Sequence, residues 1–276
     1  MNDRSILITG CSSGLGHDAA HGLKARGWRV FATCRREADC ARLRAEGLES
    51  FVLDYASTES IDSALARVLD ATGGTLDALY NNGAFALPGA VEDLPRDALR
   101  AIYETNLFGV HELTTRVIPV MRAQGHGRII QCSSVLGLVP MRWRGAYSST
   151  KFALEGLTDA LRIEMRDTPL HIITIEPGPV TSKIRENSIP HFERWIDWEG
   201  SARAGQYRES LLKRLYESSG PDRFELPASA VTAKLVHALE SPRPRPRYYI
   251  TTPTYLMGLA RRLLPTRALD WLIAKG

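Results

Sequence analysis

The sequence of 276 residues predicts an α/β fold, a doubly wound parallel sheet with helices on both faces. Short apolar runs alternate with helix-forming segments, which is typical of parallel strands joined by crossover helices. The first apolar run ends in a glycine-rich turn, and several later runs end in polar residues. Because ligands bind beyond the carboxyl ends of such strands, these residues form the candidate site.

Composition limits the class of protein. An apolar fraction of 44% and a charged fraction of 24% indicate a globular protein with a substantial core. The net charge of +4 is too small and too dispersed to indicate a nucleic-acid partner. No uncharged stretch reaches the ~18–20 residues of a membrane-spanning helix, and the first residues lack a long apolar signal segment. We therefore expect a cytoplasmic protein.

The four cysteines, Cys11, Cys34, Cys40 and Cys132, form no Cys-x-x-Cys pair and have no histidine partners at regular spacing. This spacing predicts neither a metal site nor a disulfide framework. We expect these cysteines to be reduced and mostly buried.

The start of the chain predicts a strand, a tight turn and a helix. Ser5–Thr9 is largely apolar, the turn spans Gly10–Gly16, and helix-forming residues continue to Arg26. Glycines in such a turn let the backbone approach a pyrophosphate, whose charge the helix amino terminus favours. The alternative is that these glycines form an ordinary turn that binds no ligand. Six residues are assigned to a bound dinucleotide: Gly10, Ser12, Ser13, Gly14, Leu15 and Gly16.

The end of the second predicted strand, Trp28–Thr33, indicates which dinucleotide is bound. NAD sites usually place an acid here to bond the ribose 2′-hydroxyl, but no acid precedes Glu37. Arg35 and Arg36 stand there instead, and a guanidinium suits a 2′-phosphate. Arg35 is the better candidate because it is nearer the strand. The alternative is that the two arginines only form the basic start of a helix at the surface. We predict NADP(H) as the cofactor.

Polar residues also follow the third and fourth predicted strands, Ser50–Leu53 and Leu76–Tyr80. Asp54 ends the third strand, where it is placed either to meet the adenine amino group or to cap the following helix. Asn82 and Gly83 follow the fourth strand and are expected to face the cofactor, unless they form an ordinary turn.

Two further residues are out of place for their predicted elements. Asn106 lies inside a long predicted helix, Arg96–Arg122, where asparagine is unfavourable, so a specific hydrogen-bonding role is expected. Ser134 follows the strand Gly127–Cys132 and either caps a turn or faces the ligand.

Tyr147 and Lys151 stand four residues apart at the start of a helical pattern and therefore share one helix face. A tyrosine titrates near pH ~10 and shuttles protons poorly at neutral pH unless a positive charge lowers its pKa. At an effective dielectric of about 20, a unit charge at ~4 Å contributes roughly 4 kcal/mol, or about three pKa units. The spacing thus predicts a Tyr147 pKa near neutrality. The alternative is that Tyr147 and Lys151 form an ordinary, partly exposed pair on a helix surface without a catalytic role.

Together with a strand at His171–Glu176 that ends in Pro177-Gly178-Pro179-Val180-Thr181, these motifs resemble those of the short-chain dehydrogenase/reductase family. The resemblance covers about residues 4 to 185 and rests on six motifs in order. It implies a single Rossmann-type domain with a parallel sheet of about seven strands. One departure is Asn81-Asn82-Gly83-Ala84, where the family more often reads Asn-Asn-Ala-Gly.

The resemblance implies a role for each motif. Tyr147 would donate a proton to a substrate carbonyl oxygen that Ser134 hydrogen-bonds. Lys151 would lower the tyrosine pKa and hold the nicotinamide ribose, and Asn106 would position a water. Four catalytic residues are therefore assigned, Asn106, Ser134, Tyr147 and Lys151. Further cofactor contacts are assigned to Tyr147, Lys151, Pro177, Gly178, Val180 and Thr181, the last two at the carboxamide.

The remaining segments vary within the family. We divide the chain into a catalytic domain at 1–250, with a substrate lid at 186–226, and an amphipathic helical extension at 251–276 broken at Pro265. The lid is rich in apolar and aromatic residues, which favours an apolar substrate, a core role or an oligomer contact. The extension combines apolar and basic residues, so it packs on its own domain or a neighbouring subunit, or makes weak peripheral membrane contact.

The resemblance also implies a homodimer or homotetramer, paired through the helices that carry Asn106 and Tyr147. A stripe at Leu154, Leu157, Leu161 and Met165 could supply that interface or face the sheet.

The sequence predicts NADPH-dependent reduction of an apolar aldehyde or ketone. One alternative is NAD(P)-dependent oxidation of an apolar secondary alcohol of the steroid or retinol type, because the same four residues serve both directions. The other is an NADP-binding regulator without turnover. Such family members commonly lack part of the catalytic tetrad, whereas this chain keeps all of it.

Overall fold

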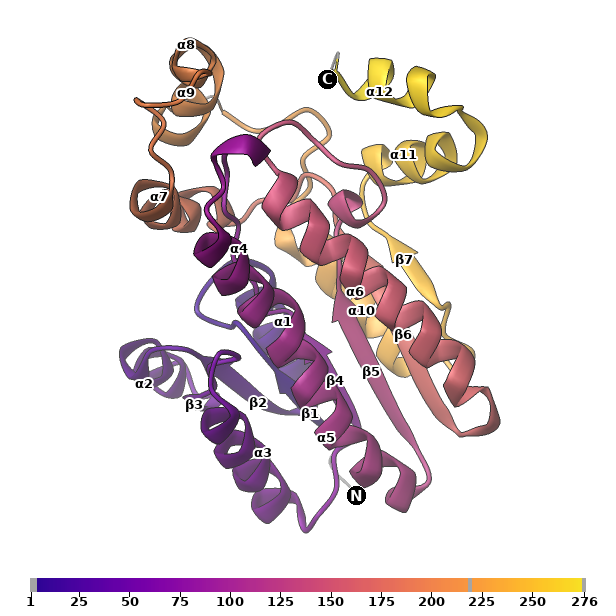
Figure 1. Cartoon of the computed structure of the whole chain (residues 1–276). Coiled ribbons are helices and arrows are strands. Elements are labelled where there is room, and N and C mark those ends of the chain that lie inside the picture. Colours follow the sequence, from indigo (N-terminus) through magenta and orange to yellow (C-terminus); the bar gives the residue numbers. More distant parts are fainter. Residues whose placement is uncertain (1–3, 218–219, 275–276) are drawn as a thin grey trace.

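The computed structural model describes residues 4–217 and 220–274, and its centre is a seven-stranded parallel sheet (Figure 1). The strands are β1 (Ser5–Ile8), β2 (Arg29–Cys34), β3 (Glu49–Val52), β4 (Ala78–Asn81), β5 (Gly127–Cys132), β6 (Leu170–Glu176) and β7 (Arg247–Tyr249). Their order is β3-β2-β1-β4-β5-β6-β7, so the chain reverses its winding direction between β1 and β4. Ligands of doubly wound sheets bind at this point, beyond the carboxyl ends of the strands.

Helices cover both faces of the sheet, which confirms the predicted fold class. They are α1 (Gly14–Lys24), α2 (Glu37–Ala45), α3 (Thr58–Thr72), α4 (Arg96–Tyr103), α5 (Gly109–Gln124), α6 (Gly145–Glu164), α7 (Ile184–Trp195), α8 (Ala204–Gln206), α9 (Leu212–Tyr216), α10 (Ala228–Glu240), α11 (Thr252–Leu263) and α12 (Thr266–Ala274). The apolar sides of α1, α2 and α10 pack on one face, and those of α3, α5 and α6 on the other.

Strand β1 shows why the apolar runs are continuous. Ile6 and Ile8 point into the cluster under α1 and α10, whereas Leu7 points into the cluster under α3 and α5. All three side chains are fully buried. Because successive side chains point to opposite faces, a sheet covered on both sides needs apolar residues at every position.

The predicted continuous helix over Arg96–Arg122 is interrupted. Between α4 and α5 the backbone forms a π-helical turn at Glu104–Phe108, and the fully buried Asn106 lies in it. Gly109 follows directly, and a Cβ there would clash with the backbone oxygen of Tyr55. The helix therefore approaches the loop after β3 more closely than any residue but glycine allows.

The apolar stripe on α6 faces the sheet. Leu154 and Met165 are buried in the core, and Leu161 packs against the same cluster. Leu157 is the exception, with 46% of its surface exposed. The sheet-facing alternative is therefore confirmed for Leu154, Leu161 and Met165, and Leu157 lies at the surface.

The C-terminal helices α11 and α12 meet at the predicted break, Pro265. Gly258 of α11 packs on the Tyr249 ring, and the Arg261 guanidinium lies 5.8 Å from the ring centre of Phe152. The segment thus packs on its own domain. Large apolar side chains remain exposed on it: Tyr255, Leu256, Leu259, Leu263, Leu264 and Trp271. Membrane contact stays a prediction, and no helix among the described residues is long and apolar enough to cross a membrane.

Candidate active site

The structure brings the predicted site residues to one edge of the sheet. Each lies at or just beyond the carboxyl end of a strand: Gly10 after β1, Arg35 after β2, Asp54 after β3, Asn82 after β4, Ser134 after β5 and Pro177 after β6. Tyr147 and Lys151 join them from the first turns of α6. The gathering of these residues follows from the parallel topology, because all strands end at the same edge.

Lys151 is held in place by the strand below it. Its side chain is 3% exposed, and its Nζ donates a hydrogen bond of 2.7 Å to the Cys132 carbonyl at the end of β5. The same Nζ lies 5.5 Å from the ring centre of Tyr147. The predicted pair is therefore formed, with the ammonium group beside the phenol ring.

The predicted lowering of the Tyr147 pKa is not found. Burial raises this pKa above its usual value, Cys132 adds to the rise, and Ser134 and Arg144 oppose it. Burial also lowers the pKa of Lys151. The estimate from spacing was wrong because it neglected desolvation, which disfavours the charged form of both groups. Tyr147 is therefore a neutral phenol at neutral pH.

Asn106 and Ser134 are fixed by local backbone groups. The Asn106 amide bonds both the N–H and the carbonyl of Phe85, at 3.0 and 2.9 Å, and its Nδ2 lies 3.3 Å from the Thr150 hydroxyl. This confirms the expected hydrogen-bonding role and ties the loop after β4 to α6. The Ser134 hydroxyl accepts a bond of 3.1 Å from the Leu136 N–H, so it caps the following turn.

The glycine turn packs directly on the Asn-Asn-Gly-Ala loop. Asn82 Nδ2 donates to the Thr9 carbonyl at 3.0 Å, and the N–H groups of Asn82 and Gly83 both donate to the Thr9 hydroxyl at 3.0 Å. Gly10 has φ +69°, and a Cβ there would come within 2.7 Å of the Gly83 Cα. A Cβ at Gly83 would stand 3.1 Å from the Tyr55 ring, which explains a glycine at this position of the loop.

The residues present fit a dinucleotide. Ser13, the residue before α1, makes no side-chain cap bond, and the first turn holds no acid. The helix N–H groups and its positive dipole end are thus available to a diphosphate. Among the described residues, none forms a hydrogen bond or ion pair with the exposed guanidinium of Arg35, whereas Arg36 pairs with Asp39 at 2.9 Å.

Two other residues that were predicted to contact the cofactor already form hydrogen bonds within the protein. The Asp54 carboxylate accepts a bond of 3.0 Å from the Ala56 N–H, while α3 is capped by Ser57 instead. The capping alternative for Asp54 is therefore wrong. The Thr181 hydroxyl donates to Glu225 at 2.7 Å, in the lid. A carboxamide contact by Thr181 would have to share or replace that bond.

The lid contributes to an apolar cluster that includes Tyr147. Phe192 and Ile196 of the α7 region and Tyr207, Leu211 and Leu215 of the following helical segment are buried with it. Of the other apolar lid residues, Trp195, Trp198 and Leu212 pack partly against the cluster. His191 stacks on Phe85, and Tyr216 and Phe224 are exposed. Tyr147 is thus buried in the same apolar cluster as these lid residues.

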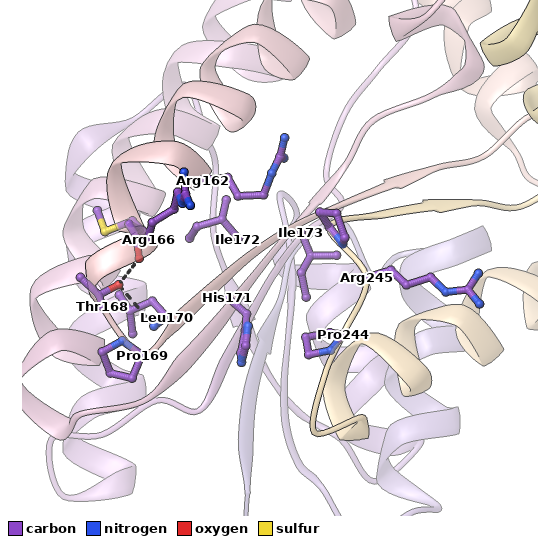
Figure 2. A pocket seen from close by; sticks show the side chains of 12 residues that line it. Arg162, Arg166, Thr168, Pro169, Leu170, His171, Ile172, Ile173, Pro244 and Arg245 are labelled. Carbon is purple, nitrogen blue, oxygen red and sulfur yellow. Dashed lines mark hydrogen bonds between the residues drawn. The ribbon is translucent and has the colours of Figure 1, made fainter.

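A crevice of about 450 Å³ lies elsewhere, between the start of β6 and the segment before β7 (Figure 2). Arg162, His171, Pro244 and Arg245 are among its lining residues. It lies at the amino-terminal edge of the sheet, opposite Tyr147. Because no catalytic or cofactor candidate lines it, we do not assign the substrate to it.

Two contributors to the site carry no motif. The Tyr55 hydroxyl joins Thr9 at 2.8 Å and Asn81 at 2.7 Å, so it links the glycine turn to the end of β4. Arg144, three residues before Tyr147, opposes the rise of the tyrosine pKa. Composition and spacing could not reveal the Tyr55 contacts, because they depend on the packing of loops distant in sequence, whereas Arg144 lies near Tyr147 in the chain without belonging to a recognised motif.

This arrangement defines a class of protein. The sheet, the uncapped helix behind a glycine turn, and a buried tyrosine beside a lysine form the scaffold of an oxidoreductase that uses a nicotinamide cofactor. The family model "short chain dehydrogenase" matches residues 4–191, and the chain belongs to that family.

Three curated relatives match along nearly the whole chain. "Uncharacterized oxidoreductase YbbO" of Escherichia coli (strain K12) is 35% identical over 97% of this chain and 93% of that protein. "Retinol dehydrogenase 16" of Mus musculus is 33% identical over 99% and 88% of the two chains. "NADPH-dependent 3-dehydrocapnine reductase" of Ornithobacterium rhinotracheale is 29% identical over 99% and 96%. The family therefore acts on alcohol and carbonyl groups, and its members differ in substrate.

Proposed function

We propose that this protein reduces an apolar aldehyde or ketone with NADPH and that Tyr147 donates the proton. The observation that carries the proposal is the burial of Tyr147 in one apolar cluster with the lid, with Lys151 beside its ring and Ser134 close enough to influence its pKa. Bound NADPH would supply the hydride to the carbonyl carbon. Tyr147 would transfer its phenolic proton to the carbonyl oxygen, and the product is the alcohol.

Tyr147 is in the protonated form that carbonyl reduction requires. Burial raises its pKa, so the side chain carries its proton at neutral pH. The same tyrosine would act as the base in alcohol oxidation, so the rate assay below decides the direction. After reduction the phenolate must regain a proton, and the nearby Lys151 ammonium is placed to stabilise it meanwhile.

The apolar cluster supports an apolar substrate. Phe192, Ile196, Tyr207 and Leu215 belong to the same buried apolar cluster as Tyr147, which favours a hydrocarbon group beside the carbonyl. The name of the retinol dehydrogenase relative supports the alternative, oxidation of an apolar alcohol, because the two reactions share substrate chemistry.

The test is a screen of cofactor consumption with aldehydes and ketones of graded chain length, with NADPH and NADH in parallel. We expect kcat/KM with NADPH to rise with chain length and to be higher than the reverse rate constant with the matching alcohol and NADP⁺. Turnover only in the oxidative direction would establish the alternative. NADPH binding without turnover of any carbonyl or alcohol would identify a regulator.

Arg35→Ala is expected to raise the NADPH dissociation constant about ten- to hundredfold and to leave NADH binding almost unchanged. The reason is that a charge-assisted hydrogen bond to the 2′-phosphate contributes roughly 1.5 to 3 kcal/mol. Direct titration of both cofactors measures this. Arg36→Ala is the matched control, because Arg36 already pairs with Asp39. Equal affinity of the wild-type protein for NADH and NADPH would refute the assignment.

Cys34→Asp, which the sequence suggests as a way to reverse the preference, is unsuitable. The Cys34 side chain is 2% exposed and belongs to the core under α1 and α2. An aspartate there would bury a charge instead of meeting the ribose.

We also propose a homodimer or homotetramer paired through α5 and α6. Phe108, the last residue of the π-helical turn before α5, is 52% exposed, and Leu157 of α6 is 46% exposed. An interface would cover both side chains. Sedimentation equilibrium at micromolar concentration is expected to give a multiple of the chain mass of 30.6 kDa. A monomer at that concentration would exclude the proposal.

A further inference from the structure

A cluster of two imidazoles and a carboxylate lies outside the active site. His17 and His21 stand one turn apart on α1, and Glu46 directly follows α2. The Nε2 atoms of both histidines lie 2.8 Å from the same oxygen, Oε2 of Glu46. The two imidazole ring centres are 4.6 Å apart. Three potential ligand atoms therefore converge on one point at the surface.

The spacing of these atoms suits a small divalent cation. The ligand atoms all lie within 4.8 Å of one another. In a tetrahedral zinc site, bonds of 2.0–2.1 Å place the ligand atoms roughly 3.3–3.5 Å apart. The two nitrogen–oxygen distances of 2.8 Å thus need to lengthen by only about half an ångström. Two histidines four residues apart on a helix present their nitrogens to one side, and three protein ligands leave one position for water.

Neighbouring groups orient Glu46 for this role. Arg42 donates to Oε1 of Glu46 at 2.8 Å, so Oε2 is the oxygen that faces the histidines. The same Arg42 donates to the Ser12 carbonyl in the glycine turn at 2.6 Å. Such outer contacts fix the orientation of metal ligands in known sites. Arg42 also adds a positive charge, which weakens cation binding and makes a moderate affinity the expected result.

We propose that His17, His21 and Glu46 bind one Zn²⁺ ion. Each imidazole would release its Nε2 proton to solvent or carry it on Nδ1, and the Nε2 lone pair would bind the metal. The ion would join α1 to the end of α2. Because α1 starts at the glycine turn and α2 starts beside Arg35, zinc would stabilise the two elements that hold the adenosine half of the cofactor.

The test is calorimetric titration of ZnCl₂ into untagged, chelator-treated protein. We expect one zinc per chain in the wild type and a dissociation constant at least about tenfold higher in His17→Gln and in His21→Gln. The melting temperature of the wild type should rise with zinc, since a ligand that binds only the folded state stabilises it, and this rise should disappear in both variants.

His126→Gln is the matched control. His126 also pairs with a carboxylate, Asp77, at 2.8 Å, but has no second histidine in the pair. Its replacement should leave zinc affinity unchanged. Melting curves without zinc and NADPH titrations show whether each variant is folded. Absence of zinc binding by the wild type, or the same affinity in the His17, His21 and His126 variants, would overturn the proposal. None of these readouts depends on the oxidoreductase activity.

Discussion

Tyr147→Phe is expected to lower kcat for carbonyl reduction by about 10²- to 10⁴-fold, the usual contribution of a positioned proton donor. NADPH affinity should change little, because the substitution removes one hydroxyl and keeps the buried ring. The Tyr147 side chain is 8% exposed and lies in the apolar cluster of the lid, so phenylalanine fits there without a cavity. Steady-state kinetics and direct NADPH titration measure the two effects separately.

Tyr248→Phe is the control for this experiment. The Tyr248 hydroxyl is also bonded in a buried position, to His237 at 2.8 Å, but lies on β7 away from the candidate catalytic residues. Its loss should leave kcat unchanged. If Tyr147→Phe keeps substantial carbonyl reduction, another group supplies the proton and the assignment of Tyr147 is wrong.

Lys151→Ala is expected to reduce kcat further than Tyr147→Phe and also to weaken NADPH binding. The ammonium lies beside the tyrosine ring, where it favours the phenolate formed after proton transfer. Its removal also leaves the buried Cys132 carbonyl without its 2.7 Å partner. Measured kcat, KM and NADPH dissociation constants separate these contributions.

The comparison variant for Lys151→Ala is Lys234→Ala on α10, which should behave as the wild type. A Lys151→Ala protein with weaker NADPH binding but normal kcat would show that Lys151 holds the cofactor and does not assist the proton transfer.

Local patterns predicted the strands and the gathering of the site. The strand Gly127–Cys132 was predicted with the bounds that the structure shows, because an apolar run bounded by glycine and serine has few other interpretations. Strand β4 begins two residues later than predicted, at Ala78, since a pattern of side chains does not define where backbone pairing starts. The parallel topology then places residues after each strand together.

Contacts between distant segments could not be predicted. The π-helical turn around Asn106 depends on the close approach of Gly109 to Tyr55, which no periodicity shows. The pKa of Tyr147 was predicted from its neighbour Lys151 alone, whereas desolvation by burial decides the direction of its shift. Glu46 meets His17 and His21 across sequence separations of 29 and 25 residues, which no local pattern predicts.

Transfer of deuterium from the cofactor to the product tests the central claim most directly. The wild-type protein is incubated with an apolar aldehyde and NADPH deuterated at the transferable C4 position, and the alcohol is analysed by mass spectrometry. We expect one deuterium on the carbinol carbon, and formation of this product about 10²- to 10⁴-fold more slowly by Tyr147→Phe. An alcohol without deuterium, or no alcohol from any aldehyde or ketone that the screen includes, would contradict NADPH-dependent carbonyl reduction by this protein.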